Sequence, residues 1–378
     1  MNAHRFIVRV VSLACLTMVT CESEQPSTCE PAAGRMCTFA GTGEPGLGDD
    51  GLDARDTELY SPQDLTFAPN GIAYVLDWNN HRIRAVDEQG ITDTVIGTGE
   101  LGDAPAGNAD MINLNHPTHI SVAHDGGVFV AAWHNSKVLR YDPAQGLVAV
   151  VCGNGMRSFA GDGGPADQAI LDLPVATAFA PDGSMYIADQ ANQRIRKVGT
   201  DNIIDTVVGT GEPGFSGDGG PAIEAKISMP LGQAAQPSGK IAVDKHGNLY
   251  LADTGNHRIR KIDADGVIDT IVGTGTAGHG GDDGPGTNAE LSSPVDLAVD
   301  DDGNVYIADT GNDCVRKLDA AGELTTVAGI CGSPGKTGDG RAAVDAKLNQ
   351  PRGVDLDAKG NLYIADTMNH RILVVYAG

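Results

Sequence analysis

This chain of 378 residues carries a formal net charge of −24 at pH 7; 51 of its residues are glycine and only 4% are aromatic. Because a strongly acidic surface repels phosphate backbones, we expect no nucleic-acid partner. Abundant glycine without long helix-favouring runs predicts many short strands joined by tight turns, as in an all-β repeat protein.

The N-terminal segment, residues 1–21, has the pattern of an export signal. Two arginines precede an apolar stretch over residues 10–19, and a polar linker follows over residues 22–34. The apolar stretch is too short for a stable transmembrane helix, and an unprocessed hydrophobic N-terminus is the alternative. Cys21 stands where a lipoprotein signal would end, so lipid anchoring and simple secretion both remain open. We therefore expect an exported protein that is secreted, periplasmic or anchored in the cell envelope.

From residue 35 to residue 378 the sequence repeats one pattern of strands and turns. A strand that ends in Asp is followed by a turn and a second strand, such as residues 258–261, and then by a turn and a third strand that ends near Gly273. Repeats that bury their apolar faces only against neighbouring repeats are typical of propellers and solenoids. The copies of the first strand are residues 74–77, 186–189, 250–253, 306–309 and 363–366, and a degenerate copy begins at Val128.

The spacing between a proline and the Asp that ends each such strand sets the register of the blades. Asp77 lies fifteen positions after Pro62, and the same spacing holds in every copy but the fourth, where an insertion falls at residues 231–238. The last copy lacks its outermost strand, whereas residues 37–43 have that strand's pattern with no copy before them. We therefore expect residues 37–43 to pair with residues 371–375 and to close a ring of six four-stranded blades without an exposed sheet edge.

The repeats resemble those of the NHL family, through the Asn-His pairs at residues 80–81, 256–257 and 369–370 that continue into Arg-Ile. The resemblance covers residues 35–378 and implies an all-β, six-bladed propeller of NHL repeats. Some NHL propellers bind RNA through a basic face, which this composition does not supply.

The long connections between blades are predicted to lie on one face, together with the turns after the Asp strands, and short hairpins on the other. We expect function on this long-loop face, since loops held by a rigid scaffold commonly carry binding residues. The connections repeat an acidic motif that could bind calcium or shape the loop; calcium needs several oxygen ligands and each copy usually supplies one, so a structural loop is favoured. The acidic positions are Asp50, Asp162, Asp218, Asp282 and Asp339.

The Asp that ends each strand and the arginines after it also recur, as in Asp253 with Arg258 and Arg260. An active site has to be asymmetric, so recurrence in most blades argues against catalysis. We predict a structural carboxylate that orders the turn and pairs with arginine.

Positions that differ between blades are better candidates for a site. His116 and His134 of blade two, with His119, form a candidate zinc or acid–base cluster. The spacing His-Pro-Thr-His is not a recognised metal signature, and the alternative is that a divergent blade collects unpaired polar residues. The residues expected to bind a ligand at the mouth of the central channel are Asp64, His119, Lys240 and Asp296.

Export would permit disulfides. A hairpin in blade five brings Cys314 and Cys331 together, and this is the predicted bridge. Cys29 with Cys37 is a second candidate that would pin the closing strand, and Cys152 is expected to be buried and free.

Two functions compete on these residues. The favoured one is a monomeric, non-catalytic propeller, without a cofactor, that presents its long-loop face to a protein, peptide or glycan, because no nucleophile elbow, phosphate loop or paired metal motif is present. The alternative is a metal-assisted hydrolase or lyase of the lactonase, strictosidine-synthase-like or amidating-lyase propeller type. It would hold calcium or zinc in the channel near Asp64, His119 and Asp296.

Overall fold

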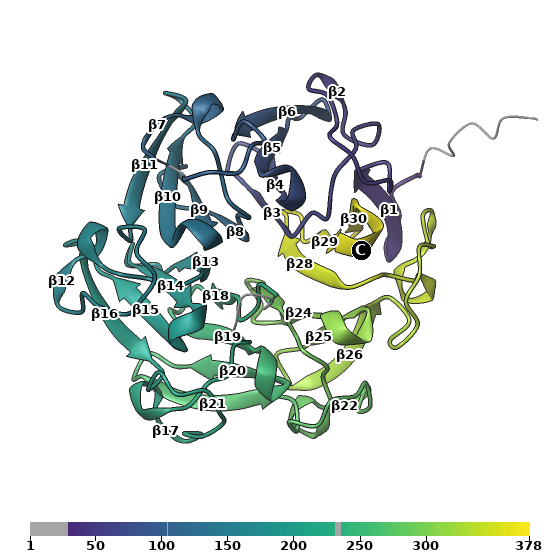
Figure 1. Ribbon diagram of the computed structural model, residues 1–378. Coiled ribbons are helices and arrows are strands. Elements are labelled where there is room, and N and C mark those ends of the chain that lie inside the picture. Colours follow the sequence, from purple (N-terminus) through teal and green to yellow (C-terminus); the bar gives the residue numbers. More distant parts are fainter. Residues whose placement is uncertain (1–28, 104, 231–235) are drawn as a thin grey trace, which may run out of the picture.

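The computed structural model describes residues 29–378, apart from residue 104 and residues 231–235, and folds them into six sheets arranged in a ring (Figure 1). The predicted export signal, the lipidation candidate Cys21 and most of the predicted linker lie outside the described residues. The prediction of a six-bladed β-propeller is confirmed.

Each blade has five strands, one more than predicted. The additional strand has two residues and belongs to the incoming connection, which pairs with the outermost long strand of the blade. In blade four, Gly220 and Pro221 pair with Ile268 and Val267. The connection therefore covers the edge that a four-stranded blade would leave open.

The first three blades are built as follows, with η marking single-turn 3-10 helices. Blade one contains β2 (Leu52–Asp53), β3 (Asp64–Phe67), β4 (Ala73–Asp77), η1 (Trp78–Asn80), β5 (Arg82–Val86) and β6 (Ile91–Ile96). Blade two contains β7 (Gly107–Asn108), η2 (Ala109–Met111), β8 (His119–Val122), β9 (Val128–Ala132), η3 (Trp133–Asn135), β10 (Lys137–Asp142) and β11 (Leu147–Cys152). Blade three contains β12 (Gly164–Pro165), η4 (Ala166–Gln168), β13 (Pro174–Phe179), β14 (Met185–Asp189), η5 (Gln190–Asn192), β15 (Arg194–Val198) and β16 (Ile203–Val208).

The last three blades repeat this order. Blade four contains β17 (Gly220–Pro221), η6 (Ala222–Glu224), β18 (Ile241–Val243), β19 (Leu249–Asp253), η7 (Thr254–Asn256), β20 (Arg258–Ile262) and β21 (Val267–Val272). Blade five contains β22 (Gly284–Pro285), η8 (Gly286–Asn288), β23 (Asp296–Val299), β24 (Val305–Asp309), η9 (Thr310–Asn312), β25 (Cys314–Leu318) and β26 (Glu323–Ala328). Blade six contains β27 (Arg341–Ala342), η10 (Ala343–Asp345), β28 (Pro351–Leu356), β29 (Leu362–Asp366), η11 (Thr367–Asn369), β30 (Arg371–Val375) and β1 (Arg35–Ala40).

The ring is closed by the two ends of the propeller, as predicted. Strand β1 pairs antiparallel with β30, with Met36 opposite Val375 and Cys37 opposite Val374. Figure 1 shows β1, in purple, beside the yellow β30. Blade six is therefore complete only when residues from both ends of the propeller are present.

The apolar core is divided among the six interfaces between neighbouring blades. Each described cluster of buried apolar side chains lies mainly between two consecutive blades, and the cluster between blades six and one includes Cys37 and Ala40 of the closing strand. Because every blade is packed on both faces, the ring forms a rigid frame for the residues around its axis.

Two disulfides are present among the described residues. Cys314 at the start of β25 is bonded to Cys331 after β26, with their Cα atoms 5.0 Å apart. Cys29 is bonded to Cys37 of the closing strand, and Cys152 is buried with a free thiol.

Candidate functional site

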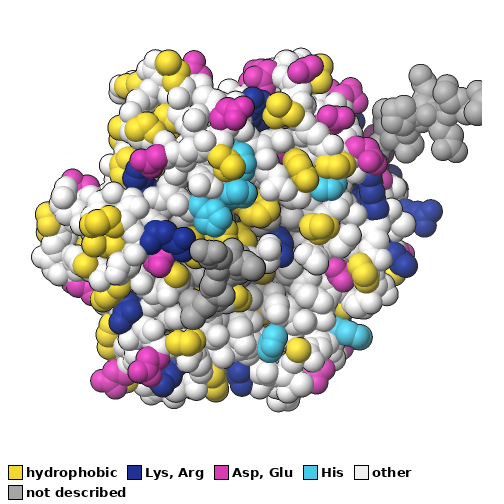
Figure 2. All heavy atoms as spheres, in the orientation of Figure 1, with side chains coloured by type: hydrophobic (Ala, Val, Ile, Leu, Met, Phe, Trp, Pro, Cys, Tyr) yellow, Lys and Arg dark blue, Asp and Glu magenta, His cyan; other side chains and the backbone are white. Residues whose placement is uncertain are grey.

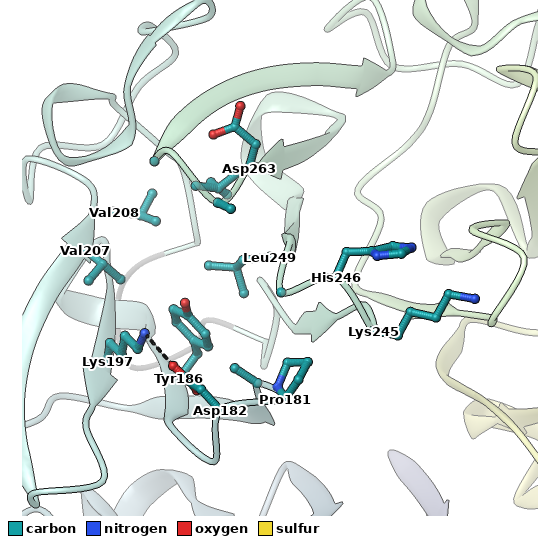
Figure 3. A pocket seen from close by; sticks show the side chains of 15 residues that line it. Pro181, Asp182, Tyr186, Lys197, Val207, Val208, Lys245, His246, Leu249 and Asp263 are labelled. Atoms are coloured by element: carbon teal, nitrogen blue, oxygen red, sulfur yellow. Dashed lines mark hydrogen bonds and ion pairs between the residues drawn. The ribbon is translucent and has the colours of Figure 1, made fainter.

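Grooves between neighbouring blades recur around the ring. The groove between blades three and four has a volume of about 440 Å³ and is lined by Tyr186 and Lys197 (Figure 3). The groove between blades four and five, of about 420 Å³, presents Tyr250 and Lys261 in the same way. The lysine Nζ lies 5.3 Å from the ring centroid of Tyr186 in the first groove and 5.4 Å from that of Tyr250 in the second. Because these grooves repeat with the blade, they follow from blade packing and do not mark a dedicated site.

The acidic positions of the long connections lie against buried arginines of the blade that follows. In blade four, Asp218 Oδ1 is 2.6 Å from Arg260 Nη2, and Asp218 Oδ2 accepts a hydrogen bond of 2.8 Å from the Thr270 hydroxyl. Such a carboxylate ties the connection to two strands of its own blade. Asp50, Asp162 and Asp282 form the same ion pair with Arg84, Arg196 and Arg316, whereas Asp339 accepts the backbone N–H of Thr38.

The Asp that ends the second long strand is also held by its own blade. Asp253 is fully buried, and it accepts the backbone N–H of Ser228 at 2.7 Å and Nη1 of Arg260 at 3.2 Å. Burial raises the pKa of Asp253, while these hydrogen bonds act to lower it. The predicted pairing of this carboxylate with arginine is confirmed for Arg260, whereas the guanidinium of Arg258 lies 3.7 Å over the ring of Phe215.

The histidines of the Asn-His pairs connect neighbouring blades. The Nδ1 atom of His257 accepts the backbone N–H of Ser293 at 3.0 Å, and that of His370 accepts the N–H of Ser61 at 3.1 Å. Ser61 and Ser293 each precede a proline and have φ of 51° and 48°. Left-handed backbone is unfavourable for a residue other than glycine, and more so before proline. The imidazole therefore fixes a strained turn of the next blade.

A cluster of histidines lies on the long-loop face between blades one and two. The ring centroids of His81 and His116 are 4.5 Å apart, and those of His116 and His134 are 5.1 Å apart. Burial lowers the pKa of His81 and of His134 to about 4, so both rings are neutral at pH 7. Figure 2 shows histidine side chains gathered close to the centre of this view.

The predicted cluster of His116, His119 and His134 is wrong in its membership. His81 takes the third place, and His119 lies in the central channel beside Asp64. The three clustered rings meet edge to face, with interplanar angles of 78° and 70°, and do not converge on one point. Within residues 29–378, as far as they are described, no three His, Cys, Asp or Glu side chains are arranged to hold a metal ion. A calcium or zinc cofactor stays a prediction.

The four predicted channel residues do come together. The Nζ atom of Lys240 lies 3.0 Å from Asp64 Oδ1 and 3.0 Å from Asp296 Oδ2, and it donates to the carbonyl of Gln63 at 3.1 Å. His119 Nε2 lies 3.8 Å from Asp64 Oδ2, and burial lowers the pKa of His119 to about 3. These buried side chains come from four blades, and the charged ones, Asp64, Lys240 and Asp296, form a salt-bridged plug across the axis.

The plug separates two cavities on the axis. Toward the hairpin face lies a cavity of about 280 Å³ lined by Asp64, His119, Asp296 and the half-buried Asp355, whose pKa is raised to about 7 by desolvation. Toward the long-loop face lies a pocket of about 400 Å³, which we call the axial pocket. Its lining includes Pro230, Gln236, Ser238, Thr254, Ser293, Val295, Thr310, Asp313, Gln350 and Arg352, from blades four, five and six.

Arg352 is the residue of the axial pocket that sequence reasoning missed. The plug residues share one position near the start of the inner strands, and in blade six this position is Gly353. Arg352 comes directly before Gly353, as Gln63 comes directly before Asp64. The available signal was a positive charge directly after the proline of the blade. The residues at that position in the other blades with regular spacing are Gln63, Thr118, Val175 and Val295.

Comparison with known proteins agrees with this architecture. The profile of the teneurin NHL domain matches residues 200–279, and that of the NHL repeat matches residues 59–85, 291–318 and 348–375. The chain is an NHL-repeat protein.

Two curated relatives of this NHL-repeat protein are much longer. Protein SUPPRESSOR OF QUENCHING 1, chloroplastic, from Arabidopsis thaliana is 28% identical over 292 residues, which cover 74% of this chain and 26% of that protein. Teneurin-3 from Danio rerio is 27% identical over 336 residues, which cover 80% of this chain and 11% of that protein. The chain thus spans only about a quarter, or less, of the relatives' length.

Among solved structures, an auxiliary nutrient binding protein from Bacteroides thetaiotaomicron superposes with a TM-score of 0.63 at 17% identity, covering 90% of this chain and 75% of that one. This similarity shows a shared fold. The two disulfides of the NHL-repeat protein fit export to an oxidising compartment. Where the chain is described, it has no helix long and apolar enough to cross a membrane.

Proposed function

We propose that this NHL-repeat protein is an exported, monomeric and non-catalytic binding propeller, which presents its long-loop face to a protein, peptide or glycan of the cell envelope or extracellular space. The observation that carries the proposal is the axial pocket, which contains residues without an equivalent in the other blades, such as Gln236 and Arg352, whereas the inter-blade grooves repeat. A concave site with a few convergent polar groups is the usual form of a ligand site. The similar fold of a protein described as nutrient binding supports a binding role.

The rim of the long-loop face supports the same role. Phe159 and Phe215 stand on the long connections before blades three and four, and Phe215 is 43% exposed. Arg194 lies 4.0 Å over the ring of Phe159, as Arg258 lies over Phe215. Aromatic rings and arginines are enriched in protein interfaces, so this rim offers contacts to a partner larger than the pocket itself.

The alternative of a metal-assisted hydrolase or lyase fits the channel residues less well. Asp64 and Asp296, its expected metal ligands, both face the ammonium group of Lys240 at 3.0 Å. A divalent cation between these carboxylates would be repelled by that charge. The donor set of the plug therefore suits a buried salt bridge better than a catalytic metal.

The proposal is tested by screening the purified chain against arrays of glycans and peptides. Gln236→Trp places a large side chain at an exposed position of the axial pocket, and His246→Trp makes the matched change in the groove between blades three and four. We expect Gln236→Trp to abolish the binding seen on the arrays and His246→Trp to preserve it. Loss of binding in His246→Trp alone, or no binding by the unaltered chain, would refute the proposal.

A further inference from the structure

Among the described residues, Arg352 is a buried cation without an anionic partner. Its side chain is only 8% exposed, and Nη1 has no hydrogen-bond partner among the described residues. Nη2 makes one contact, a 3.4 Å hydrogen bond to Oε1 of Gln350. Burial lowers the pKa of Arg352 to about 10, so the guanidinium stays charged at neutral pH. A guanidinium carries five N–H donors, and most of those of Arg352 are left for another group.

The other deeply buried cations of the chain are neutralised. Arg260 lies 3.2 Å from Asp253 and Arg371 lies 2.9 Å from Asp366. Lys240 contacts two carboxylates in the plug. Burying an unpaired charge is costly, so a fold that pairs these cations and leaves Arg352 unpaired points to an anion that is not part of the described chain.

The surroundings of Arg352 limit the charge of that anion. One guanidinium balances one negative charge, and Asp313 lines the same pocket. The plug below holds Asp64 and Asp296 against a single ammonium, and the whole chain is strongly acidic. A group with two negative charges, such as phosphate, would be repelled by these carboxylates, and Arg352 alone would balance only one of its two charges. A carboxylate carries one charge and matches the planar fork of a guanidinium.

The remaining lining suits a hydroxylated ligand. Ser238, Ser293 and Gln236 bring hydroxyl and amide groups to the pocket, whereas Pro230 and Val295 are its apolar side chains. Hydroxyl and amide groups both donate and accept hydrogen bonds, as the hydroxyls of a sugar do. A volume of about 400 Å³ is at the small end of the range for ligand pockets, which fits one or two sugar rings.

We propose that the axial pocket binds a sugar acid, with Arg352 pairing its carboxylate and the serine and glutamine side chains bonding its hydroxyls. This inference rests on the proposed binding function and names the chemical class of the ligand. The acid is either free or the terminal residue of a glycan, since both present the same group to Arg352.

The test is calorimetric titration of the full chain at constant ionic strength with D-glucuronate, D-glucose, acetate, inorganic phosphate and a trisaccharide that ends in glucuronate. We expect saturable 1:1 binding of glucuronate, at least tenfold tighter than binding of glucose, acetate or phosphate. The trisaccharide distinguishes the sources: tighter binding than the free acid indicates a glycan end, and weaker binding indicates the free acid.

Arg352→Met removes the charge and keeps an unbranched side chain, and Arg140→Met makes the same change beside the hairpin residue Asp125, on the opposite face. We expect Arg352→Met to weaken glucuronate binding at least tenfold without lowering the melting temperature, and Arg140→Met to leave glucuronate binding unchanged. A melting temperature that falls by many degrees in Arg352→Met would overturn the inference, because the arginine would then be structural.

The outcomes separate this inference from the function on which it rests. Equal binding of glucose and glucuronate, or equal glucuronate binding by Arg352→Met and the unaltered chain, overturns the sugar-acid site and leaves a binding propeller intact. Absence of glucuronate binding overturns the sugar-acid site as well. Only if the glycan and peptide arrays are also negative does the binding function fail.

Discussion

Arg260 and Arg352 are both buried arginines, but Arg260 lies among the repeated ion pairs of the blades and Arg352 lies at the axis, where the residues differ between blades. Arg260 belongs to the repeated part of the blade and faces Asp253 and Asp218, as its equivalents face their own carboxylates. Arg352 belongs to the inner strand at the axis and has no ion pair within the described residues. The difference shows that the repeated charges hold the blades together, whereas the charge of Arg352 is not neutralised by the described residues.

The largest expected effect comes from breaking the repeated pair. Arg260→Met leaves Asp253 buried without its counter-charge, which should cost about 3–5 kcal/mol of unfolding free energy. Arg258→Met is the control, with a smaller expected cost of about 1–2 kcal/mol, since Arg258 stacks on Phe215 and donates to the carbonyls of Asn256 and Thr274 but neutralises no buried carboxylate. Urea denaturation of both variants measures the difference. Equal losses would contradict the structural role of the Asp253–Arg260 pair.

A second prediction concerns blade five, where a covalent bond occupies a repeated position. In the strand register, Cys314 lies opposite Asp309, at the position where Arg258 lies opposite Asp253 in blade four. The Cys314–Cys331 disulfide closes a loop with a sequence separation of 17, so replacing both cysteines by alanine should cost about 3 kcal/mol. Denaturation of the double variant beside the unaltered chain, both without reductant so that the Cys29–Cys37 bridge stays intact, measures this cost. An unchanged midpoint in the double variant would refute the prediction.

The axial plug should respond to pH through His119. Its pKa is about 6.5 in the unfolded chain and is lowered by burial to about 3 in the fold, so below pH 6.5 the unfolded chain binds a proton that the folded chain does not. The free energy of unfolding is therefore not reduced by His119 above pH 6.5. As the pH falls from 6.5 toward 3, protonation of His119 in the unfolded chain lowers the free energy of unfolding by about 1.4 kcal/mol for each pH unit.

His119→Asn isolates that contribution, because asparagine can still accept the backbone N–H that Thr177 donates to His119 Nδ1 at 3.4 Å. Between pH 7.5 and 5.5 the unaltered chain should lose about 1.4 kcal/mol more stability than the variant, as measured by denaturation at each pH. Parallel pH profiles would show that His119 does not titrate in this way.

The smallest change in stability is expected at Arg352, which has no ion pair within the described residues. Arg352→Met removes an unpaired buried charge, so the unfolding free energy should stay within about 1 kcal/mol or rise. The measurement is the same denaturation experiment used for Arg260→Met. A loss of unfolding free energy as large as that of Arg260→Met would mean that Arg352, like Arg260, stabilises the fold.

The ring could be predicted because it depends on local spacing. The constant distance from proline to Asp aligned the inner strands, and the missing outer strand of the last blade identified β1 as its completion, which the pairing of Met36 with Val375 confirms. The fifth strand was missed, because two residues such as Gly220 and Pro221 carry no alternating pattern.

The site could be predicted only where residues occupy equivalent register positions. Asp64, His119, Lys240 and Asp296 share one position on their inner strands, and they meet at the axis. His116, His119 and His134 are close in sequence, which predicts one cluster. His119, however, lies on the inner strand beside Asp64 in the channel, and His81 of the neighbouring blade lies next to His116 instead.

The sequence by itself determined the number of blades, their register and the strand that closes the ring, because each is encoded by a pattern that repeats along the chain. Only the tertiary structure decided which charges are paired. Lys240 bonds to Gln63 across 177 residues and to Asp296 across 56, and no local pattern encodes such contacts. For the same reason, the lack of an ion pair for Arg352 within the described part of the chain became visible only when the side chains of several blades were brought around one axis.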